Sequence, residues 1–313
     1  MKITILDSAT LGVDMKFDIF EKLGETVVYE TTKQEEIAEK IKDSDVVITN
    51  KMKLNEESLS LASKLKLICV TATGFDNIDT AYCKEMGIAV CNVSGYSTNS
   101  VAQVTVSLAL SLACHLTEYN KYSKSGEYTE SGVANMLTPV YNELAGKTWG
   151  IVGMGNIGKQ VAKVAQALGC NVIYTRRSAD ENACTLQELL KESDIISIHT
   201  PLTPETKGMI GKDELQMCTK KPILINVARG AVTDEEALAE AVIDGRLSGI
   251  GIDVYSVEPF GENHIFQKLK DFDNVILTPH MAWGAYESRV RLLDEIAENI
   301  KSFYNGGNKG RIV

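Results

Sequence analysis

The chain has 313 residues, 44% of them hydrophobic, and a formal net charge of −10. This length predicts about two globular domains of roughly 100–200 residues each, and the acidic excess argues against nucleic acid as a partner, because phosphate backbones bind basic surfaces. Seven cysteines without a CxxC pair, and no long apolar segment at the N-terminus, predict no disulfide framework, no metal site and no membrane span, and they favour the cytoplasm.

The first hundred residues alternate short apolar segments with helical patterns. They predict helices at 34–41 and 56–65, and strands at 3–6, 27–29, 46–49, 67–70 and 89–91. Thr32 and Glu35 fit a capping box at the start of the first helix. Strands that alternate with helices indicate βαβ units, and therefore a parallel sheet with helices on both faces.

The same alternation begins again after residue 146. It predicts strands at 148–152, 171–174, 194–199, 223–227, 249–254 and 274–278. Thr185 with Glu188, and Thr233 with Glu236, predict two further capping boxes. The predicted fold class is therefore α/β, with two doubly wound parallel-sheet (Rossmann-like) domains in series.

A long helical pattern at about 100–122 separates the two alternating regions. Its apolar residues recur at steps of three and four and form one stripe: Val101, Val104, Leu108, Leu112 and Leu116. Two interpretations are open. The helix packs inside a domain core, or it lies at a subunit interface, because the segment that follows, to about 145, has the character of an arm that extends beyond its own domain.

A glycine-rich turn follows the strand predicted at 148–152. The segment "GMGNIG" has the GxGxxG pattern, and a helical pattern at about 157–168 follows it, which is the context of a dinucleotide-binding turn. Its glycines permit the tight turn, the close approach of a pyrophosphate and the packing of helix on strand, while the helix N-terminus faces the diphosphate. The cofactor-contacting residues predicted here are Gly153, Gly155, Asn156, Ile157 and Gly158.

The next strand ends in "NVIYTRRSAD", which carries no acid before Asp180. An NAD-binding unit normally has a carboxylate near this position, about 20 residues into the unit, to accept a hydrogen bond from the ribose 2′-hydroxyl. Arg176 stands there instead, with Arg177 and Thr175 beside it. A guanidinium binds a 2′-phosphate that a carboxylate repels, so the pattern predicts NADP(H) as the preferred cofactor, with NAD(H) also possible. The alternative is that both arginines are solvated loop charges.

Three charged side chains follow predicted strands of the second region. Arg229 follows the strand at 223–227, Glu258 lies in the loop after 249–254, and His280 follows 274–278. Carboxyl ends of parallel strands share one edge of a sheet, where doubly wound folds bind ligands, so these residues can converge beside a nicotinamide. Each alone has another interpretation: an ion-pair arginine, a loop glutamate, a core histidine.

With these motifs in order, the sequence resembles the D-isomer-specific 2-hydroxyacid dehydrogenase family over essentially its full length. The matching segments are "GMGNIG", "HTPLTPETKGMIG", "LINVARGAVTDEEAL", "GIDVYSVEP" and "TPHMAW". The resemblance implies a substrate domain formed by residues 1–97 and 286–313, and a dinucleotide-binding domain at 98–285 inserted between them. It also implies a homodimer formed through residues around 100–145.

The resemblance assigns a role to each member of the charged set. Arg229 would bind the substrate carboxylate and polarise the carbonyl, and His280 would donate the proton in reduction and accept it in oxidation. Glu258 would pair with His280 and stabilise the imidazolium. These roles agree with the chemistry of hydride transfer, because negative charge grows on the carbonyl oxygen and needs a cation and an acid beside it.

Further positions match the family's binding motifs. In "VTATGFDNID", the backbone N–H groups near Thr73 and Gly74 would bind the substrate carboxylate; a simple turn is the alternative. Asp253 would contact the cofactor or serve as an acceptor that fixes the local geometry, and His199 is expected to be structural or adjacent to the cofactor. The other cofactor-contacting positions implied are Thr200, Pro201, Thr206, Val227 and Ala228.

Within the family, the chain is most similar to the hydroxypyruvate reductase (glycerate dehydrogenase) branch. Lys51 would add positive charge near the carboxylate loop, and Trp283 would wall a small polar pocket; an exposed lysine and a core tryptophan are the alternatives. The arm lacks the tryptophan that relatives place in it, and Tyr128, Met136 and Leu137 stand there instead.

The leading hypothesis is an NADP(H)-preferring reductase that converts hydroxypyruvate or glyoxylate to D-glycerate or glycolate. An NAD-dependent D-lactate-type or phosphoglycerate dehydrogenase is the alternative, and a non-catalytic dinucleotide-sensing interaction protein is a remote one.

Overall fold

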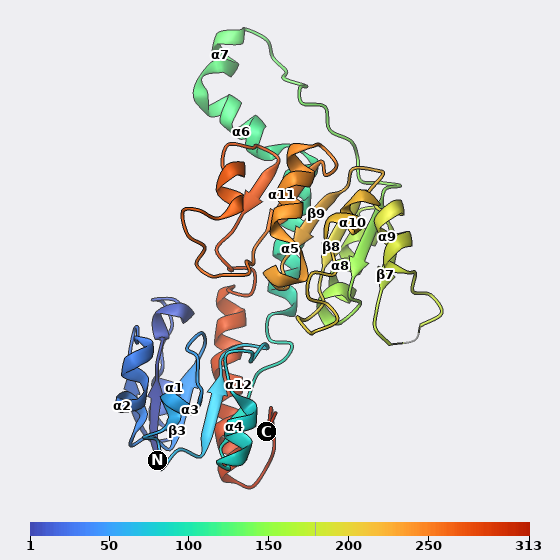
Figure 1. Cartoon of the computed structure of the whole chain (residues 1–313). Helices are drawn as coiled ribbons and strands as arrows, with labels where there is room; N and C mark the ends of the chain where they lie inside the picture. Colours follow the sequence, from blue (N-terminus) through green and yellow to red (C-terminus); the bar gives the residue numbers. More distant parts are fainter. Residues whose placement is uncertain (179) are drawn as a thin grey trace. The chain divides into compact units, whose positions relative to one another are not determined.

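The computed structural model describes residues 1–178 and 180–313. The chain divides into two compact units, which are described separately (Figure 1). The terminal unit contains Met1–Ser97 and Gly284–Val313, and the inserted unit contains Thr98–Trp283. Each unit has its own parallel sheet, which confirms the predicted fold class.

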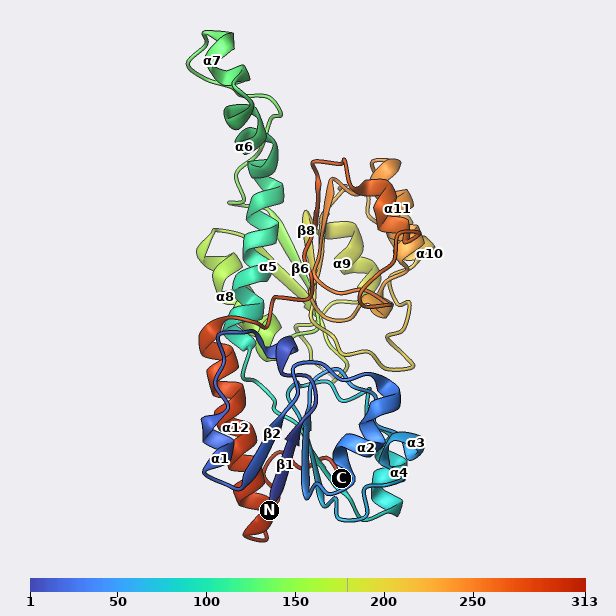
Figure 2. The ribbon, with the colours of Figure 1, turned by 90° about the vertical axis from the view of Figure 1, so that its left-hand side faces the viewer.

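The terminal unit has a five-stranded parallel sheet in the order β2-β1-β3-β4-β5. Its strands are β1 (Lys2–Ile5), β2 (Glu25–Val28), β3 (Val46–Thr49), β4 (Leu67–Val70) and β5 (Ala89–Cys91). Helices α1 (Asp18–Glu21) and α12 (Tyr286–Tyr304) cover one face, and α2 (Ile37–Ile41), α3 (Glu56–Leu59) and α4 (Thr80–Glu85) cover the other (Figure 2). Because both faces are covered, β3 and β4 are buried along their whole length.

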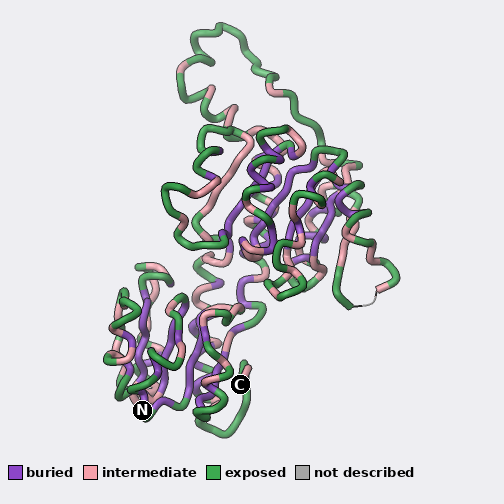
Figure 3. Tube along the Cα trace, in the orientation of Figure 1, coloured by how far each residue is buried: buried purple, intermediate pink, exposed green. Residues whose placement is uncertain are grey.

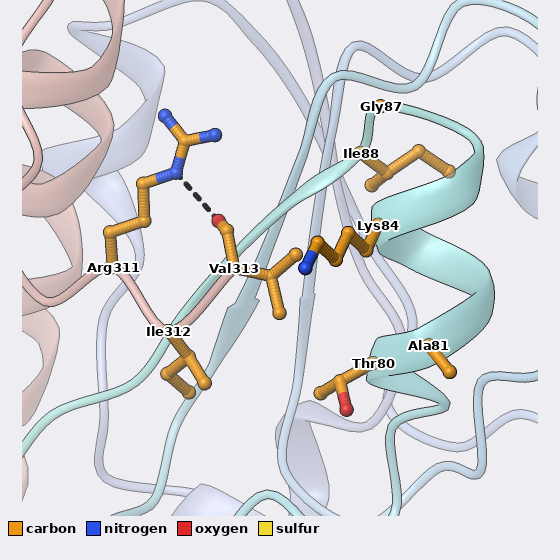
Figure 4. A pocket seen from close by; sticks show the side chains of 8 residues that line it. All are labelled: Thr80, Ala81, Lys84, Gly87, Ile88, Arg311, Ile312 and Val313. Carbon is orange, nitrogen blue, oxygen red and sulfur yellow. Dashed lines mark hydrogen bonds between the residues drawn. The ribbon is translucent and has the colours of Figure 1, made fainter.

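The last residues of the chain pair with the edge of this sheet. Ile312 N donates to Val90 O at 2.8 Å, and Asn92 N donates to Gly310 O at 3.0 Å. The segment thus satisfies backbone groups that an edge strand otherwise exposes. Figure 4 shows the surface hollow beside it, whose lining residues are Thr80, Ala81, Lys84, Gly87, Ile88, Arg311, Ile312 and Val313. This lining contains none of the residues predicted to bind substrate or cofactor.

The described residues of the inserted unit form a six-stranded parallel sheet in the order β11-β10-β9-β8-β6-β7. Its strands are β6 (Thr148–Val152), β7 (Asn171–Thr175), β8 (Ile195–Ile198), β9 (Ile223–Asn226), β10 (Gly249–Ile252) and β11 (Val275–Leu277). Helices α5 (Thr98–Ala113) and α8 (Asn156–Ala167) cover one face, and α9 (Leu186–Glu192), α10 (Lys212–Gln216) and α11 (Glu235–Ile243) the other (Figure 2).

The core of the inserted unit has two clusters of buried side chains, and Figure 3 shows that the inner strands of this unit are buried. Trp149 is fully buried, and its Nε1 donates to Ser197 Oγ at 2.9 Å. Gly251 has a built Cβ position 2.8 Å from Ile225 Cδ1 and 3.1 Å from Leu108 Cβ. The glycine therefore lets α5 pack directly against β10.

The prediction of a single helix at about 100–122 is wrong, because the helix is interrupted after α5. His115 has a left-handed backbone (φ +51°), and α6 (Leu116–Ser125) starts beyond it at 62° to α5. Val101, Leu108 and Leu112 are buried in the core, whereas Leu116 is 52% exposed. The apolar stripe therefore marks a core helix only as far as α5, and α6, α7 (Glu127–Ser131) and residues 132–142 form a segment that we call the arm.

No helix among the described residues is by itself long and apolar enough to cross a membrane. The bent pair formed by α5 and α6 has the length and apolar composition of a membrane span only when the two helices are taken together.

Two of the three predicted capping boxes are wrong. Thr185 does cap α9: Glu188 N donates to Thr185 Oγ1 at 3.2 Å, and Thr185 N donates to the Glu188 carboxylate at 2.8 Å. Thr32 instead donates from its hydroxyl to Leu6 O at 2.6 Å, and the following short 3₁₀ helix (Gln34–Glu36) leads into α2. Helix 56–65 is also shorter than predicted, because α3 ends at Leu59.

The third box fails because a neighbouring side chain is the better cap. Asp234 Oδ1 accepts from Glu236 N at 3.0 Å and from Ala237 N at 3.1 Å at the start of α11. Thr233 donates from its hydroxyl to Gly230 O at 3.0 Å, within the 3₁₀ helix Gly230–Val232. The remaining 3₁₀ helices are Ser8–Leu11 and Ile265–Leu269.

Candidate active site

The glycine-rich turn lies at the carboxyl end of β6, the strand next to the edge strand β7. Gly153 has φ +102°, and its N–H donates to Thr175 O at 3.1 Å, so the turn is joined to the end of β7. A Cβ on Gly153 would lie 2.9 Å from the carbonyl of His199. A Cβ on Gly158 would lie 2.3 Å from Gly153 O. Both positions therefore require glycine, for backbone conformation or for close packing.

Gly155, by contrast, has no heavy atom within 4 Å of its built Cβ position. The space next to it lies at the N-terminus of α8, a twelve-residue helix that begins at Asn156, with Ile157 in its first turn. The first N–H groups of a helix have no partner within the helix and carry the positive end of its dipole. A pyrophosphate therefore fits this turn, and the residues present suit a dinucleotide.

A carboxylate lies beside the arginine at the end of β7. Asp180 Oδ2 is 3.1 Å from Arg176 Nη1 and accepts a hydrogen bond from Tyr174 Oη at 3.0 Å, while Asp180 Oδ1 accepts from Asn182 N at 3.1 Å. The Asn182 N–H and the Tyr174 hydroxyl lower the pKa of Asp180, with a smaller effect from Arg176. Arg176 is thus an ion-pair partner, and Arg177 next to it is exposed.

The segment after β8 contributes the next predicted cofactor positions. Thr206 Oγ1 donates to Pro201 O at 2.7 Å and accepts from Thr203 N at 2.8 Å, which closes the loop that begins with Thr200. The ring nitrogens of His199 are shielded from solvent and have no hydrogen-bond partner among the described residues. Burial lowers the pKa of His199 to about 3, so its ring is neutral at physiological pH.

His280 and Glu258, the two residues predicted to form the acid–base pair, are in contact in the inserted unit. His280 Nδ1 lies 2.6 Å from Glu258 Oε2, and Tyr255 N donates to Glu258 Oε1 at 3.0 Å, so the carboxylate is held from both sides. The His280 and Glu258 side chains are 21% and 26% exposed. His280 has φ +53°, a backbone conformation that is uncommon for residues other than glycine and is found at functional sites.

Asp253, at the end of β10, fixes the segment that carries His280. Its Oδ1 accepts from Thr278 Oγ1 at 2.6 Å and from Met281 N at 2.9 Å, and its Oδ2 accepts from Ala282 N at 2.9 Å. Burial raises the pKa of Asp253, and these hydrogen bonds counteract the rise. Of the two predicted roles, these contacts describe the acceptor that fixes local geometry.

Arg229 follows β9, the strand next to β10. Asn226 Oδ1 accepts from Ala228 N at 3.0 Å, and Asn226 Nδ2 donates to Arg229 O at 3.0 Å, so one buried amide holds the backbone on both sides of the turn. A Cβ on Gly230 would lie 2.1 Å from the carbonyl carbon of Tyr255. The Arg229 turn therefore packs directly against the loop that leads to Glu258.

The substrate positions predicted in the terminal unit lie on two loops that follow β3 and β4. Asp7 Oδ2 accepts from Lys51 N at 2.7 Å, and burial raises the pKa of Asp7 although such hydrogen bonds lower it. Thr73 Oγ1 donates to Val93 O at 2.8 Å, and Asn92 Nδ2 donates to Thr73 O at 2.6 Å, next to Gly74. Both loops are therefore held at the carboxyl edge of the sheet.

Comparison with known proteins identifies the chain's relatives. Residues 106–282 match the model of the "D-isomer specific 2-hydroxyacid dehydrogenase, NAD binding domain". A glycerate dehydrogenase of Methylorubrum extorquens is 36% identical over 97% of this chain and 96% of its own, and a hydroxypyruvate reductase of Blautia hydrogenotrophica is 35% identical over 98% of both.

The chain belongs to the D-isomer-specific 2-hydroxyacid dehydrogenase family. It is an NAD(P)-dependent oxidoreductase that acts on the CH–OH group of small 2-hydroxy acids and reduces the corresponding 2-oxo acids. A solved structure of similar fold is the NADPH-dependent glyoxylate/hydroxypyruvate reductase of Sinorhizobium meliloti in complex with NADP and malonate. It has a TM-score of 0.84 and 26% identity, and the alignment covers 100% of this chain and 96% of that one.

Other residues predicted for this dehydrogenase lie in the core of the inserted unit. Val227 is 8% exposed, and Trp283 and Ala228 are partly buried and packed against core residues. Trp283 thus makes the contacts of a core tryptophan, and a wall for the substrate pocket stays a prediction.

Sequence reasoning missed the side chains that support the dehydrogenase site. Asn226 and Tyr255 were not singled out, although each lies within a motif that was recognised, "LINVARG" or "GIDVYSVEP". Tyr255 Oη donates to Thr278 O at 2.9 Å and so ties the Glu258 loop to the His280 segment. A polar residue inside an otherwise apolar strand motif is the signal that could have revealed Asn226.

Proposed function

We propose that this dehydrogenase prefers NADPH and reduces hydroxypyruvate or glyoxylate to D-glycerate or glycolate. The observation that carries the proposal is the His280–Glu258 pair at 2.6 Å, formed in the same sheet as Arg229 and the glycine-rich turn. The relatives named glycerate dehydrogenase and hydroxypyruvate reductase support this substrate class, since each matches nearly the full length of the chain.

In the proposed reaction, Arg229 and His280 both face the substrate carbonyl oxygen. The glycine-rich turn and the N-terminus of α8 would hold a reduced dinucleotide, which would supply the hydride for the carbonyl carbon. Arg229 stabilises the negative charge that develops on the oxygen, and His280 delivers a proton to it from Nε2, because Nδ1 is paired with Glu258. Glu258 holds the ring in orientation and stabilises the imidazolium before the proton leaves. In the oxidation direction, His280 accepts the proton of the hydroxyl group.

The substrate carboxylate is assigned to the terminal unit. The backbone N–H groups near Thr73 and Gly74 would bind it, with Lys51 adding positive charge. The side chains of Asp7 and Asn92 hold the backbones of these two loops. The terminal unit is therefore proposed as the substrate domain and the inserted unit as the dinucleotide-binding domain.

NADPH preference rests on Arg176. Its position after Thr175, whose carbonyl accepts from Gly153 N, places it next to the turn proposed for the pyrophosphate. The relative of known structure that is described as NADPH-dependent supports this cofactor. Asp180 beside Arg176 favours a second candidate, an NAD-dependent dehydrogenase of the D-lactate or phosphoglycerate type, because a carboxylate at this place suits a ribose 2′-hydroxyl.

The test is steady-state kinetics with hydroxypyruvate, glyoxylate, pyruvate and 3-phosphohydroxypyruvate, each with NADPH and with NADH. We expect the highest kcat/KM for hydroxypyruvate with NADPH, and Arg176→Asp to shift the cofactor ratio toward NADH. A wild-type enzyme that strongly prefers NADH would contradict the cofactor assignment. Absence of turnover with all four acids would contradict the proposed substrate class.

We also propose that the enzyme is a homodimer formed through α5 and the arm. Apolar side chains of the arm are exposed, including Val133 (60%), Leu137 (74%) and Val140 (75%). Their contact with a second copy would remove this apolar area from water. Sedimentation equilibrium should give twice the chain mass, and Leu137→Asp should weaken the association; a wild-type monomer at micromolar concentration would refute the proposal.

A further inference from the structure

We propose that Asp180 is a specificity-determining residue that limits the enzyme's preference for NADPH over NADH. It holds Arg176 when the cofactor carries no 2′-phosphate and opposes the phosphate when one is present. This inference rests on the proposed function, in which Arg176 faces the adenosine ribose, and it adds a residue that acts against the arginine.

Asp180 is held by three donors that come from different positions of the chain. Its Oδ2 accepts from Tyr174 Oη at 3.0 Å and lies 3.1 Å from Arg176 Nη1, and its Oδ1 accepts from Asn182 N at 3.1 Å. The carboxylate side chain is only 18% exposed, whereas that of Arg176 is 36% exposed. Asp180 is therefore an ordered acceptor and not one half of a loose surface pair.

The location of Asp180 connects it to the cofactor. Tyr174 belongs to β7, and the carbonyl of the next residue, Thr175, accepts from Gly153 N at 3.1 Å. Units that bind NAD place a carboxylate at this strand end to accept from the ribose 2′-hydroxyl. The strand end itself has no acid in this chain, but the fold returns Asp180 to the guanidinium that occupies the position.

The charges give the two residues opposite effects on a 2′-phosphate. A phosphate group carries about −1.5 to −2 charges near neutral pH, and a guanidinium binds it best with two parallel N–H donors. Asp180 already pairs with one terminal nitrogen of Arg176. A 2′-phosphate that binds Arg176 must therefore approach the negative carboxylate of Asp180. Arg176 thus attracts NADPH while Asp180 weakens its binding, and NADH, which lacks the phosphate, escapes the repulsion.

The test compares Asp180→Asn with Glu181→Gln. Asparagine keeps an oxygen for the Asn182 N–H and removes the charge, and Glu181→Gln removes the same charge from the exposed neighbouring residue. We expect Asp180→Asn to raise the NADPH/NADH ratio of kcat/KM about tenfold, equivalent to about 1.4 kcal/mol, through a lower KM for NADPH. Glu181→Gln should change the ratio less than about twofold.

Equilibrium binding provides a readout that does not depend on turnover. Calorimetric titration with 2′,5′-ADP and with 5′-AMP measures the 2′-phosphate contribution directly. Asp180→Asn should tighten 2′,5′-ADP about tenfold relative to 5′-AMP. The inference is overturned if the ratio moves less than about twofold in both assays, or if Glu181→Gln gives the same change.

The outcome also separates this inference from the proposed NADPH preference. A wild-type enzyme that prefers NADH contradicts the preference alone, provided that Asp180→Asn moves the ratio toward NADPH. A wild-type enzyme that prefers NADPH, with an unchanged ratio in Asp180→Asn, contradicts the role of Asp180 alone.

Discussion

Replacing Gly230 with alanine should reduce turnover by displacing the loop that carries Glu258. The built Cβ of residue 230 lies 2.1 Å from the carbonyl carbon of Tyr255 and 2.3 Å from Ser256 N, whereas ordinary contact begins at 3.4 Å. The two backbone segments must therefore separate by 3.4 − 2.1 = 1.3 Å along the shorter contact. Both atoms belong to the main chain, so a rotamer change in a side chain cannot relieve the overlap.

The displacement affects two groups of the proposed mechanism. Arg229 precedes the substituted residue, and Tyr255 N donates to the carboxylate of Glu258, which is paired with His280. A misplacement of about 1 Å can reduce the rate about 100-fold, which corresponds to about 2.7 kcal/mol in the activation free energy. Overpacking should also lower the free energy of unfolding by about 1–3 kcal/mol.

The matched control is Gly261→Ala, in the loop that carries Glu258. Gly261 has no heavy atom within 4 Å of its built Cβ position, so its alanine variant should keep kcat/KM within about twofold. Both variants are assayed with hydroxypyruvate well below their melting temperatures, so that unfolding does not contribute. The reasoning is refuted if Gly230→Ala keeps kcat/KM within about threefold of wild type, or if Gly261→Ala loses as much activity.

Three further predictions follow from other parts of the inserted unit. Gly158→Ala places a Cβ 2.3 Å from Gly153 O and should weaken dinucleotide binding at least about tenfold, measured by fluorescence titration; unchanged binding would contradict the proposed pyrophosphate turn. Arg229→Lys keeps the charge but loses the planar donor pair, so kcat should fall about 10²-fold while the melting temperature changes little; near-normal kcat would remove Arg229 from its role. Burial lowers the pKa of His199 from 6.5 to about 3, so between pH 3 and pH 6.5 the ring is protonated in the unfolded chain but not in the folded one. The free energy of unfolding is therefore highest above pH 6.5 and decreases as the pH falls. At pH 5.5 the loss is about 1.4 kcal/mol relative to pH 7.5, so urea unfolding of His199→Asn should be less sensitive to this pH change than that of wild type; equal sensitivity would refute the buried neutral ring.

The amino-acid sequence by itself determined the fold class and the identity of the motifs. Apolar strands at 46–49, 67–70 and 148–152 were predicted with the bounds that the structure has, because a strand buried on both faces is a continuous apolar run. Gly153 and Gly158 of "GMGNIG" were equally readable, since positive φ at the first and close packing at the second exclude other residues. These signals are local, and each depends on a few consecutive residues.

The tertiary structure decided which hydrogen bonds hold the predicted residues and which of these residues are paired with an opposite charge. The sequence does not tell whether the Arg176 guanidinium is available to a phosphate or is paired with a carboxylate. The structure shows that it is paired, because Asp180 Oδ2 lies 3.1 Å from Arg176 Nη1. Asp253 similarly gained its role from Met281 N and Ala282 N, 28 and 29 residues away. The helix break at His115 was also invisible in the apolar periodicity. In all three cases a specific hydrogen bond, ion pair or backbone angle decided the outcome, and such features leave no periodic trace in the sequence, whereas apolar burial and glycine conformation do.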